Sequence, residues 1–102
     1  MPQAEHYIYT LHPARLEMLT AGPTAEEADI ISRHATYLED LAEKGVVVLA
    51  GRTQTRDADT FGIVIVNAES EAEARVVMEN DPGVKYGVQR AKLYPFRIAA
   101  QR

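Results

Sequence analysis

The sequence predicts an α+β fold with a ferredoxin-like β-α-β-β-α-β order, and three observations support this prediction. Two capping boxes, Thr24–Glu27 and Ser70–Glu73, each precede a helical pattern. Four segments rich in β-branched or aromatic residues flank these helices. The 102 residues contain no internal repeat or linker. We therefore interpret residues 1–102 as one domain, in which two helices cover one face of a four-stranded antiparallel sheet.

The first strand is predicted over residues 6–12, where aromatic and β-branched side chains dominate. Tyr7, Tyr9 and Leu11 should share one face of this strand because successive side chains alternate. Pro13 is expected to close the strand, since it has no N–H to donate. A connector with at most a short helical turn follows, up to Pro23.

The main helix should begin near Ala25 and end at Gly45, a residue that tolerates the positive φ of a helix C-terminus. Its apolar stripe recurs at three- and four-residue spacing. The members of this stripe are Ile31, His34, Leu38, Leu41 and Ala42. Because a leucine would pack better than an ionisable ring, His34 raises the main functional question of the sequence.

The second half of the chain completes the pattern. Buried strands are predicted over 46–51 and 61–66, joined by the polar hairpin connection 52–60, with a close backbone approach or a bulge at Gly62. A shorter helix should follow Ser70 and end by Asp81, because Pro82 disfavours helical geometry before it, and Gly83 should continue a turn. The last strand is expected over 88–98.

The two helices should cover one face of the sheet and leave the other face open. That open face has too many apolar residues to face water alone, which predicts a homodimer.

Composition excludes several functions. The net charge of −4 and the lack of a Lys/Arg cluster argue against nucleic acid or an anionic membrane as a partner. The absence of cysteine excludes disulfides and thiolate chemistry. No apolar run resembles a signal peptide or a membrane span, so we expect a cytoplasmic protein. His6 and His12 lie too far apart along one strand to share a metal ion, so no metal is expected. The sequence has no phosphate-binding loop, and no cofactor is expected. It also has no strained turn that would expose a nucleophilic serine, which argues against a serine hydrolase.

Several segments, taken in order, resemble the YciI-like (YCII-related) family from about His6 to Ile98. The matching segments are 34–38, 41–45, 49–51, Phe61-Gly62, 70–74, Asp81-Pro82 and 93–96. The resemblance implies a ferredoxin-like protomer in a dimeric α/β barrel-like assembly. It also implies a lyase or isomerase acting on small organic acids, with an active site on His34 and Asp81. The segment around Arg15 also resembles the family. Many members have a proline where this chain has Arg52. A cation there could bind a substrate carboxylate, or the family's usual ligand is not used by this chain.

Each candidate residue could also have a purely structural role in place of a functional one. His34 is either a core histidine bonded to backbone or a general base oriented by Asp81. Asp81 could equally serve only as a local cap before the Pro-Gly turn. Arg15 and Arg52 are expected substrate-binding residues unless they are merely solvated. Tyr7 and Tyr9 should pack in the sheet, and a hydroxyl of either could reach a pocket.

Two hypotheses of function remain at this stage. In the first, the protein is an enzyme without a bound cofactor, in which His34 moves a proton on a small carboxylated or hydroxylated substrate. In the second, it is a non-catalytic dimeric module that binds a small ligand, with His34 donating a hydrogen bond. Both hypotheses predict the same fold, so the fold cannot separate them.

Overall fold

A computed structural model of the protein describes residues 5–102, with side chains from residue 6 onward. The elements along the chain are β1 (Glu5–Pro13), α1 (Glu17–Thr20), α2 (Ala25–Glu43), β2 (Val47–Arg52), β3 (Gly62–Ala68), α3 (Glu71–Asn80), α4 (Pro82–Lys85) and β4 (Gln89–Phe96). The strands form one antiparallel sheet in the order β2-β3-β1-β4. The α+β class and the predicted β-α-β-β-α-β order are therefore confirmed, with α1 and α4 as short additions.

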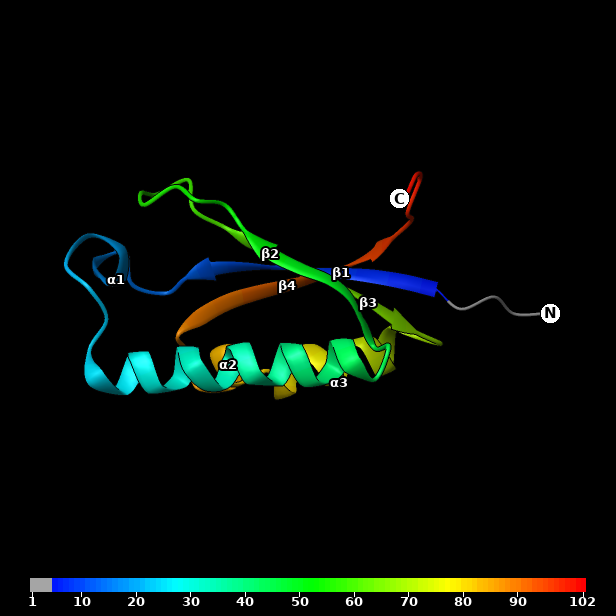
Figure 1. Ribbon diagram of the computed structural model, residues 1–102, viewed down its shortest axis with the longest axis horizontal. Coiled ribbons are helices and arrows are strands. Elements are labelled where there is room, and N and C mark those ends of the chain that lie inside the picture. Colours follow the sequence, from blue (N-terminus) through cyan, green and yellow to red (C-terminus); the bar gives the residue numbers. More distant parts are fainter. Residues whose placement is uncertain (1–4) are drawn as a thin grey trace.

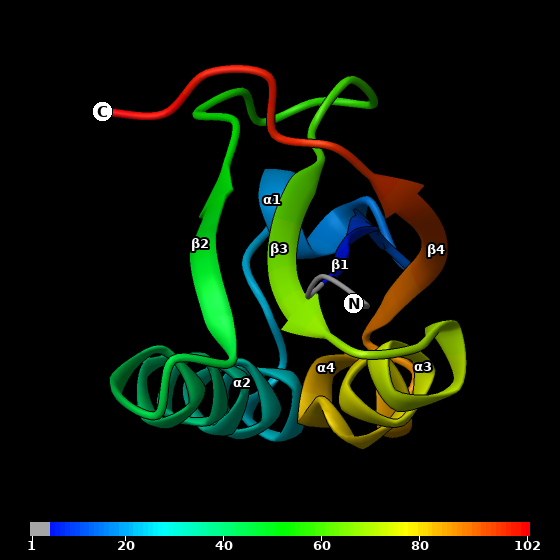
Figure 2. The same ribbon diagram turned by 90° about the vertical axis from the view of Figure 1, so that its right-hand side faces the viewer.

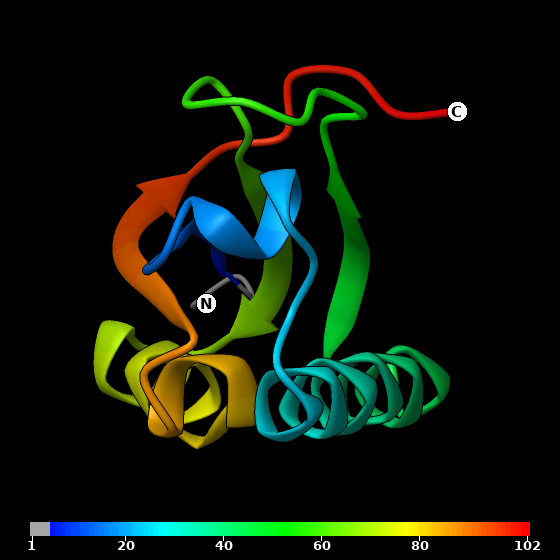
Figure 3. The same cartoon turned by 90° about the vertical axis from the view of Figure 1, so that its left-hand side faces the viewer.

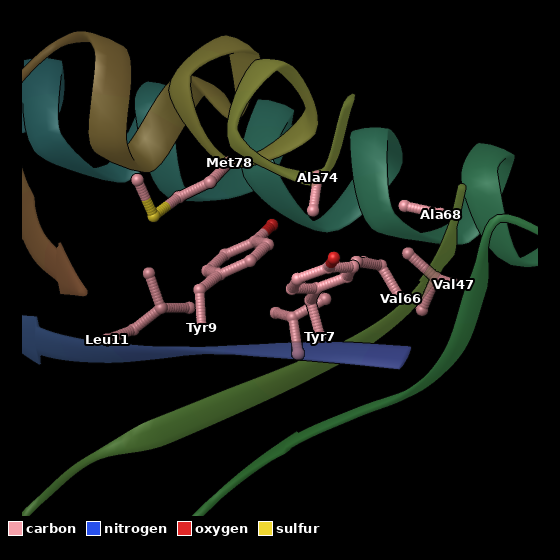
Figure 4. Packing of buried hydrophobic residues seen from close by; sticks show 9 residues of the cluster. Tyr7, Tyr9, Leu11, Val47, Val66, Ala68, Ala74 and Met78 are labelled. Carbon is pink, nitrogen blue, oxygen red and sulfur yellow. The ribbon is translucent and has the colours of Figure 1, made fainter. Parts of the chain in front are cut away.

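The two long helices lie on the same face of the sheet. Figure 1 shows α2 and α3 running beneath the four strands, and Figure 2 shows them side by side. The core fills the space between the helices and the sheet, and Tyr9, Val64 and Val66 are completely buried there. Tyr7, Tyr9 and Leu11 all point toward the helices, as predicted from the alternation of β1 (Figure 4).

Local signals set the ends of α2 as the sequence predicts. The Thr24 hydroxyl accepts from the Glu27 amide at 3.1 Å, and the Glu27 carboxylate accepts from the Thr24 amide at 2.8 Å. The helix ends at Glu43, and Gly45 then adopts a φ of 78°.

The predicted apolar stripe of α2 is wrong at its two ends, because Ile31 is 38% exposed and Ala42 is exposed, whereas Ile30 is buried. The middle of the stripe is confirmed, since His34, Leu38 and Leu41 are partly buried.

Other boundaries also differ from the sequence prediction. Pro82 to Lys85 form the short helix α4 where a turn was expected, because Asp81 caps it and Pro82 occupies its first turn. Pro13, by contrast, closes β1 as predicted: it is the last residue of the strand and pairs with Gln89. At the start of α3, the Ser70 hydroxyl accepts from the Glu73 amide at 3.1 Å, which is one half of the predicted capping box.

The prediction for Gly62 is confirmed as a close backbone approach. A Cβ at this position would lie 3.2 Å from the carbonyl oxygen of Gly51 on the neighbouring strand. The ladder irregularity lies instead in β2, between Val47 and Leu49.

The short helix α1 packs at one end of the layered structure. Figure 3 shows it in front of the strands at this end of the sheet, above the ends of α2 and α4 in that view. Met18 of α1 forms a small buried cluster with Ile30 of α2 and Val88, which precedes β4. This cluster explains the burial of Ile30, because the partner of the first turns of α2 is α1 and not the sheet.

No helix of residues 5–102 covers the sheet face opposite α2 and α3. The strand registers place Ile8, Ile65 and Tyr94 side by side on this face. Leu49 is 51% exposed and Phe96 is 37% exposed on the same side. In the part of the chain described, no helix is long and apolar enough to cross a membrane.

Candidate active site

His34 and Asp81 meet at the junction of α2, α3 and α4. The His34 Nδ1 atom lies 2.5 Å from the Asp81 Oδ1 atom, and the Asp81 side chain is fully buried. Forty-seven positions separate these residues in the sequence. They meet because α4 packs against the face of α2 that carries His34, and Asp81 lies between α3 and α4. The juxtaposition inferred from the sequence is therefore present.

The carboxylate of Asp81 is held by two further donors. The Tyr9 hydroxyl donates to Oδ2 at 2.8 Å, and the Gly83 amide donates to Oδ1 at 3.0 Å. Burying a charged carboxylate is costly unless it is hydrogen-bonded, and these contacts offset that cost. The local capping role and the contact with His34 therefore coexist in one side chain.

Two phenols share the environment of Asp81. Burial, followed by the nearby charge of Asp81, raises the pKa of Tyr9 far above its ordinary value. The same two causes raise the pKa of Tyr37 to about 12, and the Tyr37 hydroxyl donates to the carbonyl of Val77 at 2.7 Å. Both hydroxyls consequently stay protonated at neutral pH, so Tyr9 acts as a fixed hydrogen-bond donor to the carboxylate.

The second ring nitrogen of His34, Nε2, has a different environment from Nδ1. No hydrogen bond joins Nε2 to any residue that the structure describes, and the side chain retains 14% exposure. A carboxylate at Nδ1 selects the tautomer with its proton on that nitrogen, as assigned from the hydrogen-bond network. Nε2 then carries the lone pair that a general base requires.

Sequence reasoning missed Gly83 and Gln89, which both lie beside the His–Asp pair. A Cβ on Gly83 would lie 2.7 Å from Gln89 Oε1, 3.3 Å from His34 Nδ1 and 3.5 Å from Asp81 Oδ1. The missing side chain of Gly83 thus makes room for the Gln89 oxygen. The Asp-Pro-Gly string was a signal for Gly83, whereas Gln89 is brought here by the packing of β4 and carried no local signal.

The predicted substrate-binding residues lie in different places. The Arg15 guanidinium pairs with Glu27 through Nε at 2.9 Å and Nη2 at 2.6 Å, which occupies its bidentate face. Arg52 is exposed at the end of β2, beside a surface hollow that Leu49 and Phe61 also line. Tyr7 is buried in the core. The structure therefore brings Tyr9 to the His–Asp pair, and it places Arg52 at the hollow on β2.

A second surface hollow lies near the end of β1 and is lined by His12, Leu16, Asp57 and Arg90, among others. Neither of these hollows includes His34 in its lining. Within residues 5–102, no group of three or more His, Cys, Asp or Glu side chains is arranged to hold a metal ion.

Comparison with known proteins identifies the family. The family model of the YCII-related domain matches residues 7–97, nearly the whole chain. The chain belongs to the YCII-related family. The resemblance noted from the sequence segments is thereby confirmed, and a search of curated proteins finds no match.

Solved structures with the same fold include an enzyme. The 5-chloro-2-hydroxyhydroquinone dehydrochlorinase of Burkholderia phenoliruptrix, in complex with 2,5-dihydroxybenzoquinone, aligns with a TM-score of 0.63 and 24% identity, covering 89% of this chain and 93% of its own. An uncharacterized protein of Thermotoga maritima aligns with a TM-score of 0.54 and 11% identity, covering 93% of this chain and 100% of its own. At these identities the similarity establishes the fold alone.

Proposed function

We propose that this YCII-related protein is a lyase or isomerase that works without a bound cofactor on a small hydroxylated or carboxylated organic compound. The observation that carries the proposal is the contact of His34 Nδ1 with the buried carboxylate of Asp81 at 2.5 Å. Such a pair provides a general base whose ring is oriented by the carboxylate.

The proposed step is removal of a proton from a carbon next to a carbonyl group, or from a hydroxyl group of the substrate itself. His34 Nε2 accepts the substrate proton, and the imidazolium that forms is stabilised by Asp81 through Nδ1. Tyr9 and the Gly83 amide keep Asp81 in place during this transfer. Return of the proton to another atom gives an isomerase, whereas departure of a leaving group gives a lyase.

The structural relative from Burkholderia supports the lyase alternative. That protein is a dehydrochlorinase, and its structure contains a dihydroxylated quinone. Elimination of this type needs a base that takes a proton and no redox group on the protein, which suits a His–Asp pair. For the present chain, small polyhydroxylated rings are therefore the first substrates to test, followed by hydroxy and keto acids.

Of the residues predicted to bind substrate, Arg52 and Arg15 keep this role in the proposed function. Tyr7 and Tyr9 do not, because both side chains are buried and the Tyr9 hydroxyl is already bonded to the carboxylate of the pair. Arg52 is the better placed of the two cations to bind a substrate anion, because Glu27 already engages Arg15. The proposal also includes a homodimer formed through the uncovered sheet face, so that a second subunit covers Leu49 and Phe96. No nucleic acid or membrane is proposed as a partner.

A non-catalytic small-ligand module is the second candidate function. One observation favours it: the His34 side chain is only 14% exposed, and the two surface hollows described above lie elsewhere. In this alternative the ring donates a hydrogen bond to a bound ligand, and no proton transfer occurs.

Replacing the proposed base tests this function directly. Wild type, His34→Ala and His34→Asn would be assayed on polyhydroxylated benzenes, hydroquinones and small hydroxy and keto acids. We expect turnover by wild type and a loss of about 10²- to 10⁴-fold in kcat for both variants, the usual contribution of a general base. His12→Asn, an exposed histidine outside the pair, is the matched control and should keep its activity. Full turnover by His34→Ala would refute the enzymatic proposal and leave the binding module.

A further inference from the structure

Gln89 carries a buried polar atom that no group of the chain satisfies. Its side-chain oxygen, Oε1, is buried and is the one such side-chain atom without a hydrogen-bond partner among the residues that the structure describes. A buried acceptor without a partner destabilises the fold, so a hydrogen bond from outside the chain would be favourable.

The position of this oxygen links it to the His–Asp pair. Gln89 Oε1 and His34 Nδ1 both lie within contact distance of one point beside Gly83, at 2.7 Å and 3.3 Å from where a Cβ would stand. The rest of the Gln89 side chain is only half-buried, which leaves it at the edge of the core. Rotation about its terminal torsion is soft, so the amide can present its oxygen to a ligand at small cost.

We propose that Gln89 is a specificity-determining residue of this site, whose side-chain oxygen accepts a hydrogen bond from a hydroxyl of the bound substrate. The inference rests on the proposed function and narrows its substrate class to compounds that carry a neutral hydroxyl. A carboxylate or an ether has no proton to donate to Oε1 and would leave it unpaired.

Three hydrogen-bond donors near Asp81 already have other acceptors and do not bond to Gln89 Oε1. The backbone amide of Gly83 already donates to Asp81, and the Tyr9 hydroxyl does the same. The Tyr37 hydroxyl donates to the Val77 carbonyl. These three donors are therefore engaged elsewhere, and none of them is bonded to Gln89 Oε1.

Two probes that differ only in their donors test the assignment. Hydroquinone and its dimethyl ether have the same ring, and their dissociation constants would be measured by calorimetry with wild type, Gln89→Leu and Gln89→Glu. We expect wild type to bind hydroquinone about 10-fold more tightly than the ether, which corresponds to one satisfied acceptor. Gln89→Leu should lose this preference by weakening hydroquinone alone, and Gln89→Glu, which keeps an acceptor, should retain it.

Several outcomes would overturn the assignment. Wild type that binds both probes equally, or neither, removes the proposed acceptor role, and so does a Gln89→Leu variant with unchanged preference. Equal weakening of both probes would mean that Gln89 only shapes the structure, and thermal unfolding of each variant checks that the fold persists. These readouts measure binding and not turnover. A preference that depends on Gln89, found beside a His34→Ala variant with full turnover, would therefore reject the catalytic base but keep the binding role.

Discussion

Asp81 is a buried carboxylate whose free-energy cost of burial depends on three partners. It is completely buried and receives hydrogen bonds from Tyr9 and from the Gly83 amide while it contacts His34. A buried carboxylate with these partners is a fixed electrostatic element, because moving any one of them leaves an unmet charge. The geometry of the base is thus determined by groups on β1, α2 and α4 together.

The glycine beside this group gives a prediction at the same scale. Gly83→Ala favours the short helix by about 1 kcal/mol, but its new Cβ would overlap Gln89 Oε1 and press on the His34 ring. Because the glutamine end can swing away, we expect the free energy of unfolding in urea to change by less than about 1 kcal/mol. Activity should nevertheless fall about 10-fold or more, since the base is displaced by a few tenths of an ångström.

Gly51→Ala is the matched control for this substitution. A Cβ at Gly51 would meet no atom within 4 Å, and its backbone does not have a positive φ. This variant should keep wild-type activity and stability. Wild-type activity in Gly83→Ala would show that the space beside the His34–Asp81 pair has no part in the chemistry.

At the scale of the element, the first turn of α2 combines a cap with an ion pair. Glu27 caps Thr24 and binds Arg15, and these hydrogen bonds lower the pKa of Glu27 to about 2, the bond from Arg15 contributing most. The depressed pKa means that the ion pair stabilises the fold at neutral pH. This contribution is fully present above the unfolded-state pKa of about 4.3 and is lost as the pH falls toward 2.

Glu27→Gln tests this linkage. The difference in free energy of unfolding between wild type and the variant should stay constant from pH 7 to about pH 5 and shrink as the pH falls from there to 3. Urea unfolding at each pH would measure it. Glu26→Gln, in the same turn but exposed and without a side-chain hydrogen bond in the described chain, should show a weaker dependence on pH. A difference that does not change with pH would contradict the role of the ion pair.

The elements also show how far sequence reasoning reaches. The start and end of α2 were predictable because a capping box and a glycine act within a few residues. The burial of Ile30 in place of Ile31 was not predictable, because it depends on Met18 of α1, whose position is set by tertiary packing. Four residues are too few for periodicity, so α4 was missed as well.

The residues of the candidate site also divide into those with a local sequence signal and those placed by tertiary packing. His34 was detectable as a titratable ring in an apolar stripe, and Asp81 as the residue before a Pro-Gly pair, although their contact joins distant segments. Gln89 has no such signal, because a polar residue at the start of a strand is ordinary. Only the packing of β4 against α4 reveals that its oxygen is buried without a partner.

At the scale of the whole molecule, the apolar face of the sheet opposite the helices is the feature that favours a dimer. The described residues form a single helix layer on one side of the sheet. On the other side, apolar side chains lie beside one another or on adjacent strands: Ile8, Leu49, Ile65 and Phe96. Apolar surface of this kind gains roughly 25 cal/mol for each Å² removed from water. A second copy offers the same surface, and a twofold axis brings the two faces together.

Leu49→Glu tests the proposed dimer at this face. Leu49 is 51% exposed in the single chain, so the substitution places a charge in the proposed interface without disturbing the core of the protomer. We expect sedimentation equilibrium to give twice 11.3 kDa for wild type and a shift toward 11.3 kDa for the variant. Val76→Glu adds the same charge at a residue that is 56% exposed on α3, away from the sheet, and should remain dimeric. A wild-type monomer would refute the assembly, and a dimeric Leu49→Glu variant would place the interface on another face.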